Sequence, residues 1–177
     1  MTTYLNIKVR GTLAKALIAS LRFDELHQRI LEQYAPGLLE LSDSDWYPVA
    51  NIVTALQKLI EARHSFDSTF DMVAIGVAGA QHAPVPEGTT LEAFLVGQPA
   101  MIEQLYDGNY EIHSTAEKIG PNHYRIEVDP PWPYDLMYGT YYGFAKRLLP
   151  EGSTFTLHKA EKDQGDQRPM VFEIEWT

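Results

Sequence analysis

The sequence predicts an α+β fold, in which a mainly helical N-terminal part is followed by a small antiparallel four-stranded sheet with one helix packed on it. Three observations support this prediction. Apolar residues recur at helical spacing in the first part of the chain. Residues 123–129 and 170–176 alternate apolar and polar side chains, which is the period of a strand with one buried face. Between them, the tyrosine-rich segment 134–149 has the length of a helix and stops before Pro150.

The N-terminal part is expected to begin with an extended segment, Tyr4 to Val9, and to continue with two short helices that stop at Pro36-Gly37. The firmest helical pattern comes next, because apolar residues from Val49 to Ile60 follow the i, i+3, i+4, i+7 spacing of one helix face. Pro48 suits the first turn of this helix, where its missing N–H would have no partner. Trp46-Tyr47-Pro48 is therefore predicted to open the helix.

Two further helices are expected before the sheet. Ser68 and Asp71 form a capping-box-like start for a helix from Thr69 to about Gln81. The body of this helix is small and apolar all round, which predicts a buried helix. The next helix spans residues 91–106, and its Pro99 predicts a break or a bend.

The C-terminal part predicts two hairpins. Residues 110–118 and 123–129 are the first two strands, and Gly120-Pro121-Asn122 supplies their turn. Residues 153–159 and 170–176 are the last two strands, which a charged, glycine-containing loop joins, so we expect them to pair antiparallel.

Length and composition predict one domain over residues 1–177, with residues 1–107 mainly helical and residues 108–177 in the order strand, strand, helix, strand, strand. A chain with 45% hydrophobic residues can bury a sizeable core. Its apolar runs are far shorter than the roughly 18 residues of a membrane span, and its start lacks the pattern of a signal peptide. We expect a cytoplasmic protein with no membrane span.

Charge and residue content exclude several functions. A formal charge of −10 repels nucleic acid, so no nucleic-acid partner is expected. The chain has no cysteine, and its six histidines lack the spacing of known zinc motifs, so no metal site is predicted. No Gly-x-Ser-x-Gly or phosphate-binding loop occurs, so we predict no catalytic residues and no enzyme. The alternative is that Glu127, Asp129 and Asp135 act as acids beside Trp132.

The tyrosine-rich helix is the best candidate for the wall of a ligand site. Its tyrosines combine a large apolar area with hydroxyls that can orient a ligand, although packing of the rings on the sheet is the alternative interpretation. Gly139 and Gly143 on the same helix predict a close approach of another backbone, through packing on the sheet, a dimer contact or ligand access. The aromatic candidates are Trp132, held between two prolines, Tyr134, Tyr138 and Tyr142 on one side of the helix, Tyr141 on the neighbouring side, and the outlying Trp46.

The segment Tyr110 to Trp176 resembles the C-terminal half of a ligand-binding fold. Haem nitric-oxide sensors, vinyl-reductase-type (4VR) domains and Bet-type subunits of Golgi transport tethering complexes share this fold. Val9-Arg10-Gly11, Trp46-Tyr47-Pro48 and Glu103 to Tyr106 resemble a bacterial family of the same superfamily, which extends the resemblance over nearly the whole chain. The resemblance implies a domain that binds a small molecule.

The chain departs from the cofactor motifs of these relatives. Vinyl-reductase-type domains often have metal-binding cysteines near the final hairpin, but residues 163–169 contain none, which argues against zinc. Haem nitric-oxide sensors use a histidine on the helix before the sheet and a Tyr-x-Ser-x-Arg motif on a following strand. Residues 91–106 contain no histidine, and of that motif only Tyr124 corresponds. The sequence therefore predicts no cofactor and argues against haem.

Taken together, these patterns predict a non-enzymatic sensory domain that binds an unknown small apolar molecule and acts through a partner protein. The alternative is an interaction or adaptor module with no small ligand, which forms a homodimer or docks on a signalling partner.

Overall fold

The computed structural model describes residues 6–19, 25–64, 72–108, 113–159 and 169–177. The helices in these ranges are α1 (Gly11–Ile18), α2 (Glu25–Tyr34), α3 (Val49–His64), α4 (Met72–His82), α5 (Leu91–Leu105) and α6 (Tyr134–Leu148). The strands are β1 (Lys8–Arg10), β2 (Trp46–Pro48), β3 (Tyr106–Asp107), β4 (Ser114–Gly120), β5 (His123–Val128), β6 (Phe155–Lys159) and β7 (Met170–Trp176).

The second half of the chain forms the predicted four-stranded antiparallel sheet, with strand order β4-β5-β7-β6. Both predicted hairpins are present, because β4 pairs with β5 and β6 with β7. Asn122 has φ 53° in the first turn, a left-handed conformation that asparagine tolerates. β7 lies between β5 and β6, and Phe172 and Ile174 on it are fully buried. The predicted α+β fold is confirmed.

A second, three-stranded sheet was not predicted from the sequence. Its order is β2-β1-β3, and both pairings are antiparallel. The prediction that Trp46-Tyr47-Pro48 opens a helix is wrong, because these residues form β2 and α3 begins at Val49. A proline is tolerated in β2 because this strand lies at the sheet edge, where one side of its backbone needs no partner.

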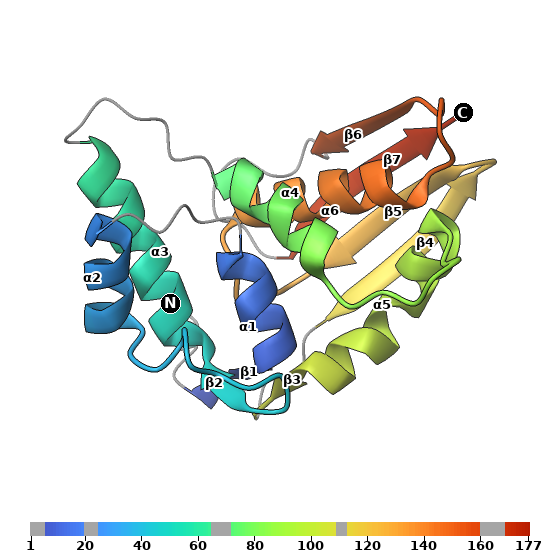
Figure 1. The fold of residues 1–177 in the computed structure, drawn as a ribbon. Helices are drawn as coiled ribbons and strands as arrows, with labels where there is room; N and C mark the ends of the chain where they lie inside the picture. The colour runs from blue at the N-terminus through green and yellow to red at the C-terminus, as the bar shows by residue number, and fades with distance from the viewer. Residues whose placement is uncertain (1–5, 20–24, 65–71, 109–112, 160–168) are drawn as a thin grey trace.

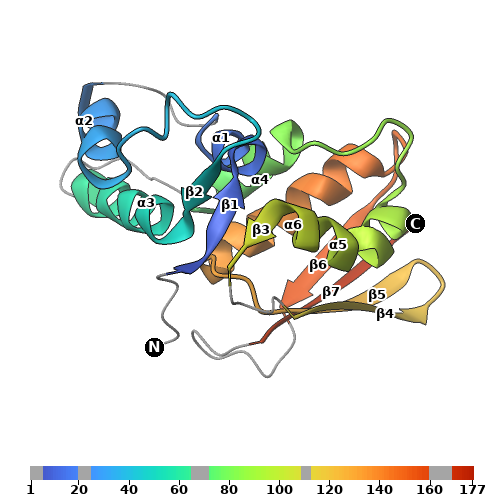
Figure 2. The same ribbon diagram turned by 90° about the horizontal axis from the view of Figure 1, so that it is seen from below.

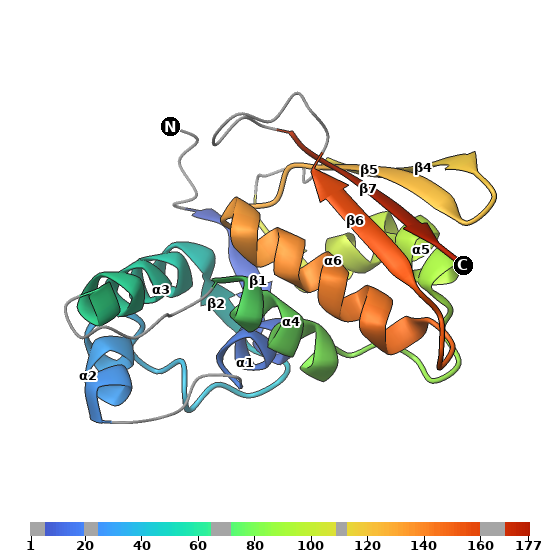
Figure 3. The same cartoon turned by 90° about the horizontal axis from the view of Figure 1, so that it is seen from above.

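The elements stack in layers (Figures 1 and 3). α6 lies along one face of the four-stranded sheet, α4 packs on α6, and α1 packs on α4. α5 runs beside β4 (Figure 2), and the α2 and α3 pair lies at the end of the molecule away from that sheet. None of the described helices is long and apolar enough to cross a membrane.

The contact between α4 and α6 is built on glycines. A Cβ placed on Gly139 would lie 2.1 Å from the carbonyl oxygen of Val73, and one on Gly143 would lie 2.8 Å from that of Val77. The reverse holds for Gly76, whose Cβ would meet the backbone of α6. The close approach that Gly139 and Gly143 predicted is therefore packing of helix on helix, and not of helix on sheet.

Contacts at the ends of α4 and α5, and a proline inside α5, shape the helical layers. Pro99 does not break α5, which continues to Leu105. Thr90 caps α5, since its Oγ1 accepts from the Ala93 N–H at 3.1 Å. Arg147, near the end of α6, reaches the C-terminus of α4, where its Nη1 donates to the carbonyl oxygens of Ala80 and Ala83 at 2.7 and 2.8 Å. The predicted cap at Ser68 lies outside the described residues.

Candidate functional site

An apolar cavity lies where α1, α4, α5 and α6 meet the segment that follows β5. Its volume is about 80 Å³. Most of its wall is aliphatic or aromatic, and each helix contributes to it. Representative lining residues are Leu17 from α1, Ala80 from α4, Phe94 from α5 and Met137 from α6. An apolar wall of this kind holds an apolar ligand, or part of one.

One buried polar pair stands in this wall. Gln98 on α5 donates from Nε2 to the hydroxyl of Tyr141 on α6 at 2.7 Å. Gln98 is only 6% exposed and Tyr141 1%. The other amide atom, Gln98 Oε1, is buried and has no hydrogen-bond partner among the described residues. Burial raises the pKa of Tyr141 well above its usual range, against the opposing effect of the Gln98 hydrogen bond, so its phenol stays neutral at physiological pH.

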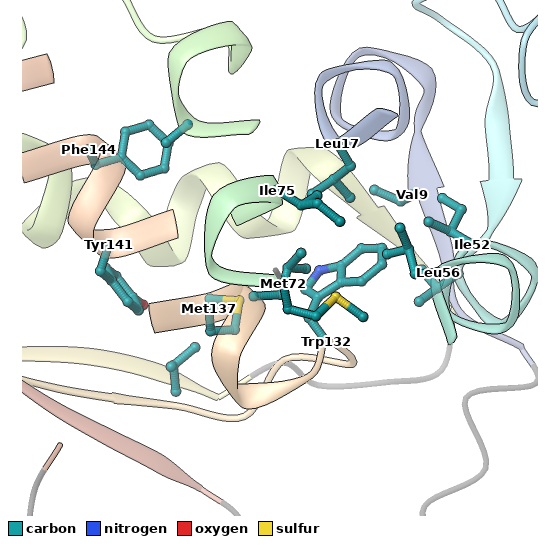
Figure 4. Packing of buried hydrophobic residues seen from close by; sticks show 14 of the residues in the cluster. Val9, Leu17, Ile52, Leu56, Met72, Ile75, Trp132, Met137, Tyr141 and Phe144 are labelled. Atoms are coloured by element: carbon teal, nitrogen blue, oxygen red, sulfur yellow. The ribbon is translucent and has the colours of Figure 1, made fainter. Parts of the chain in front are cut away.

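A second hydrogen bond holds the aromatic residue after β5 in place. Trp132 Nε1 donates to the hydroxyl of Tyr106 at 2.6 Å, and both residues line the cavity. Desolvation raises the pKa of Tyr106 as well. Trp132 is only 3% exposed and lies among the buried residues of the core (Figure 4), so its ring forms part of the enclosed wall of the cavity.

The aromatic candidates from the sequence separate into two groups. Trp132 and Tyr141 line the cavity. The other tyrosines of α6 do not line the cavity and pack on the sheet, whose Phe172 the Tyr141 ring also meets, with centroids 5.1 Å apart. Tyr134 stacks on Phe172 with ring centroids 5.0 Å apart, Tyr142 packs on Phe155 at 5.0 Å, and the Tyr138 hydroxyl donates to the Leu157 carbonyl oxygen at 3.4 Å. For these three rings, the structure shows the packing that the alternative interpretation proposed.

Trp46 lies in a different place, a wide and open hollow beside the three-stranded sheet. The Arg10 guanidinium carbon lies 4.2 Å from the centroid of its ring. Arg10 also donates from Nη1 to the Ser44 carbonyl oxygen at 2.9 Å. Trp46 therefore serves as a platform for a paired arginine and does not line the apolar cavity.

The titratable groups near the sheet form partly exposed pairs. His113 Nε2 lies 3.7 Å from Glu127 Oε1, and His123 Nε2 lies 3.8 Å from Glu173 Oε2. Neither pair lines the apolar cavity. Within the described ranges, no group of three or more His, Cys, Asp or Glu side chains is arranged to hold a metal ion.

Gln98 and Tyr106 are polar residues of the cavity wall that were not predicted from the sequence, and for Gln98 a signal existed. The signal was available, because Leu91, Phe94, Leu95 and Gln98 follow the spacing of one helix face and the first three are buried. A polar residue within such an apolar stripe must find a partner or leave a buried polar atom unsatisfied. The pattern thus marks Gln98 as unusual, although it does not identify Tyr141 as its partner.

Comparison of the structure with solved structures identifies relatives of the fold. An oxygen-binding H-NOX domain related to soluble guanylate cyclases, in its oxygen complex, has a TM-score of 0.66 at 14% identity and covers 94% of this chain and 92% of its own. A mutant of the T. Tengcongensis H-NOX has a TM-score of 0.66 at 14% identity, with 94% of each chain covered. A structure described as modulating haem redox potential through porphyrin distortion has a TM-score of 0.65 at 13% identity, over 93% and 96% of the two chains.

These likenesses show an H-NOX-like fold. They bear on the haem nitric-oxide sensor part of the resemblance and not on its vinyl-reductase or transport-tethering parts. No protein-family model and no curated protein sequence matches the chain.

The comparisons correct one prediction. The sequence predicted no cofactor and argued against haem, and this exclusion is wrong, because structures that share the fold over nearly the whole chain include one described by its haem. The exclusion used the absence of one histidine and one strand motif. Tyrosine, methionine and cysteine also serve as axial ligands of haem iron, so those two absences do not exclude the cofactor.

Proposed function

We propose that this chain is a sensory domain, not an enzyme, that binds an apolar small molecule in the cavity between α1, α4, α5 and α6 and transmits its occupancy to a partner protein. The observation that carries the proposal is the cavity itself. Its wall is apolar except for a few buried polar groups, and it lies between packed layers whose spacing a ligand can change. The H-NOX-like fold supports this proposal.

Haem is the first ligand to test, because it is named for a structure of the same fold. The chemistry of the wall fits the face of a porphyrin, which is largely apolar. Met101, Met137 and Tyr141 line the cavity and belong to side-chain types that hold haem iron in other proteins. When bound, haem supplies an iron centre that can bind diatomic gases.

The volume sets a condition on this proposal. The cavity of about 80 Å³ is smaller than the roughly 300 Å³ or more of pockets that enclose a drug-sized ligand. A haem would therefore enter only if the helices around the cavity move apart. We expect haem loading to change the environment of α1 and α5 as well as of the residues that touch the ligand.

Titration of the purified chain with haem, followed by absorbance of the Soret band, tests the proposal. We expect a saturable shift at one equivalent. The matched variants are Ala83→Phe, which places a ring at the cavity wall, and Ala100→Phe, which makes the same change at an exposed position on α5. Ala83→Phe should weaken binding and Ala100→Phe should not.

Xenon, which binds dry apolar cavities, extends the test to ligands other than haem. Xenon-induced shifts of the methionine methyl resonances of Met101 and Met137 should be present in the wild type and reduced in Ala83→Phe. The proposed function is wrong if neither haem nor xenon binds, or if Ala83→Phe binds both as the wild type and the control Ala100→Phe do.

The alternative of a dimerising adaptor module has less support from the structure. The large apolar side chains that are exposed among the described residues are Leu39, Val96, Ile119 and Tyr142, which come from four separate segments. Single exposed apolar residues are normal on a monomer, whereas an interface needs a contiguous patch.

A further inference from the structure

We infer that the cavity recognises a small, uncharged molecule that carries a hydroxyl group on an apolar skeleton, and that Gln98 and Tyr141 bind this hydroxyl. The inference rests on the proposed function, since it names the ligand chemistry of the same cavity. It starts from the unpartnered Gln98 Oε1, an acceptor in a wall that is otherwise mostly apolar.

A buried amide oxygen without a partner has a cost. Leaving a buried acceptor unsatisfied destabilises the folded state by roughly 1–3 kcal/mol. Gln98 is 94% buried by its 6% exposure, so bulk solvent does not serve it. A ligand that donates to Oε1 recovers this loss only when it is bound, which makes the amide a recognition group.

Tyr141 completes the polar site. The hydrogen bond from Gln98 Nε2 uses a lone pair of the Tyr141 oxygen, so the O–H proton of Tyr141 remains able to donate. An acceptor and a donor therefore stand next to each other in the wall. A hydroxyl matches this pair, because it can donate to Gln98 Oε1 and accept from the Tyr141 O–H.

The same match holds if the amide group is turned over. Tyr141 would then donate to Oε1, and the amide N–H groups would be free to donate to the ligand. A hydroxyl accepts as readily as it donates, so it satisfies either orientation. An ionised group placed against this pair does not fit, since no lysine or arginine lines the cavity to balance its charge.

The volume limits the size of the skeleton. An engineered cavity of about 150 Å³ binds benzene, and this cavity measures about 80 Å³. A molecule of about four or five heavy atoms is therefore the appropriate probe. Butan-1-ol has this size, and 1-fluorobutane has nearly the same shape but has fluorine in place of the hydroxyl, so it cannot donate a hydrogen bond.

The experiment measures the dissociation constants of butan-1-ol, 1-fluorobutane and xenon from the methyl resonances of Met101 and Met137. The variant Gln98→Met keeps the side-chain length and removes the amide. The matched control is Gln104→Met, the same change at an exposed position of α5 outside the cavity. Tyr141→Phe is the second variant, in case Gln98→Met does not fold.

We expect Gln98→Met to weaken the binding of butan-1-ol on the order of fivefold, the ratio that corresponds to one neutral hydrogen bond. The affinities for 1-fluorobutane and xenon should stay unchanged. Tyr141→Phe should also weaken the alcohol selectively, and Gln104→Met should change nothing. The inference is overturned if these cavity variants change the affinities for butan-1-ol and 1-fluorobutane alike, or change neither affinity. Absence of butan-1-ol binding in the wild type also overturns the inference, whereas the proposed function itself is overturned only if neither haem nor xenon binds, which is a different result.

Discussion

Replacing Gly139 with alanine should separate α4 from α6. The Cβ of Gly139→Ala would lie 2.1 Å from the Val73 carbonyl oxygen and 2.8 Å from both the carbonyl carbon and the Cα of the same residue. Real Cβ atoms essentially never come within 3.0 Å of another heavy atom. All three obstructing atoms belong to backbone, so no side-chain rotation can relieve the contact. The two helices must move apart by about 1 Å along this direction.

Two opposing effects decide the magnitude. Alanine favours a helix interior over glycine by roughly 1 kcal/mol. Overpacking of a well-packed core costs about 1–3 kcal/mol, and occasionally more. Because the opposing atoms are the backbone of Val73, which cannot rotate away, the overpacking cost of Gly139→Ala lies at or above the top of this range. We therefore expect a net loss of about 2 kcal/mol in the free energy of unfolding, which for a domain of this size lowers Tm by roughly 4–8 °C.

Thermal and urea denaturation, followed by circular dichroism, measure this loss. The matched control is Gly97→Ala, because Gly97 also lies inside a helix but a Cβ there would meet nothing within 4 Å. The control should gain about 0.5–1 kcal/mol. If Gly139→Ala is as stable as Gly97→Ala, the glycines are not required by contact between the two helices and the argument is refuted.

Three further changes test other contacts. Arg147→Met should cost about 1–2 kcal/mol in urea unfolding because it removes the donor to the Ala80 and Ala83 carbonyl oxygens at the C-terminal end of α4, whereas Lys146→Met on the exposed side of α6 should change little. Hydrogen bonds from the Tyr124 hydroxyl, and to a smaller extent from Lys118, lower the pKa of the Glu92 carboxyl from 4.5. The stabilisation that these bonds give is therefore present above pH 4.5 and is lost as the pH falls through the lowered pKa. Glu92→Gln should therefore flatten the acid side of the stability curve, and an unchanged curve would contradict this assignment. Burial raises the pKa of Tyr141 from 10.0, so stability should fall as the pH rises above 10, and Tyr141→Phe should reduce that fall in alkaline denaturation.

Periodicity explains why much of the fold followed from the sequence. Alternation in residues 123–129 and 170–176 identified β5 and β7, and the turn residues Gly120-Pro121-Asn122 identified the first hairpin. These are local patterns, in which each residue's neighbours along the chain carry the information. The three-stranded sheet was missed because β1, β2 and β3 are only two or three residues long. Such strands have no period to detect, and their pairing depends on distant parts of the chain.

The site followed from the sequence only in part. Trp132 and Tyr141 were among the predicted residues, and both line the cavity. Spacing placed Tyr134, Tyr138 and Tyr142 on one side of the helix, but spacing cannot say whether that side meets a sheet or a cavity. The exclusion of haem failed for a related reason, since a missing motif describes one way of holding a cofactor and not the whole pocket.

The sequence by itself determined the helices, the four strands of the C-terminal sheet and the glycine-containing stripe of α6, because hydrophobic period and turn chemistry are local properties. The tertiary structure alone decided that this stripe meets α4, that three tyrosines pack on the sheet, and that Gln98 and Tyr141 meet across the cavity. These contacts join residues far apart in the chain. They depend on how the layers stack, and no local pattern specifies that stacking.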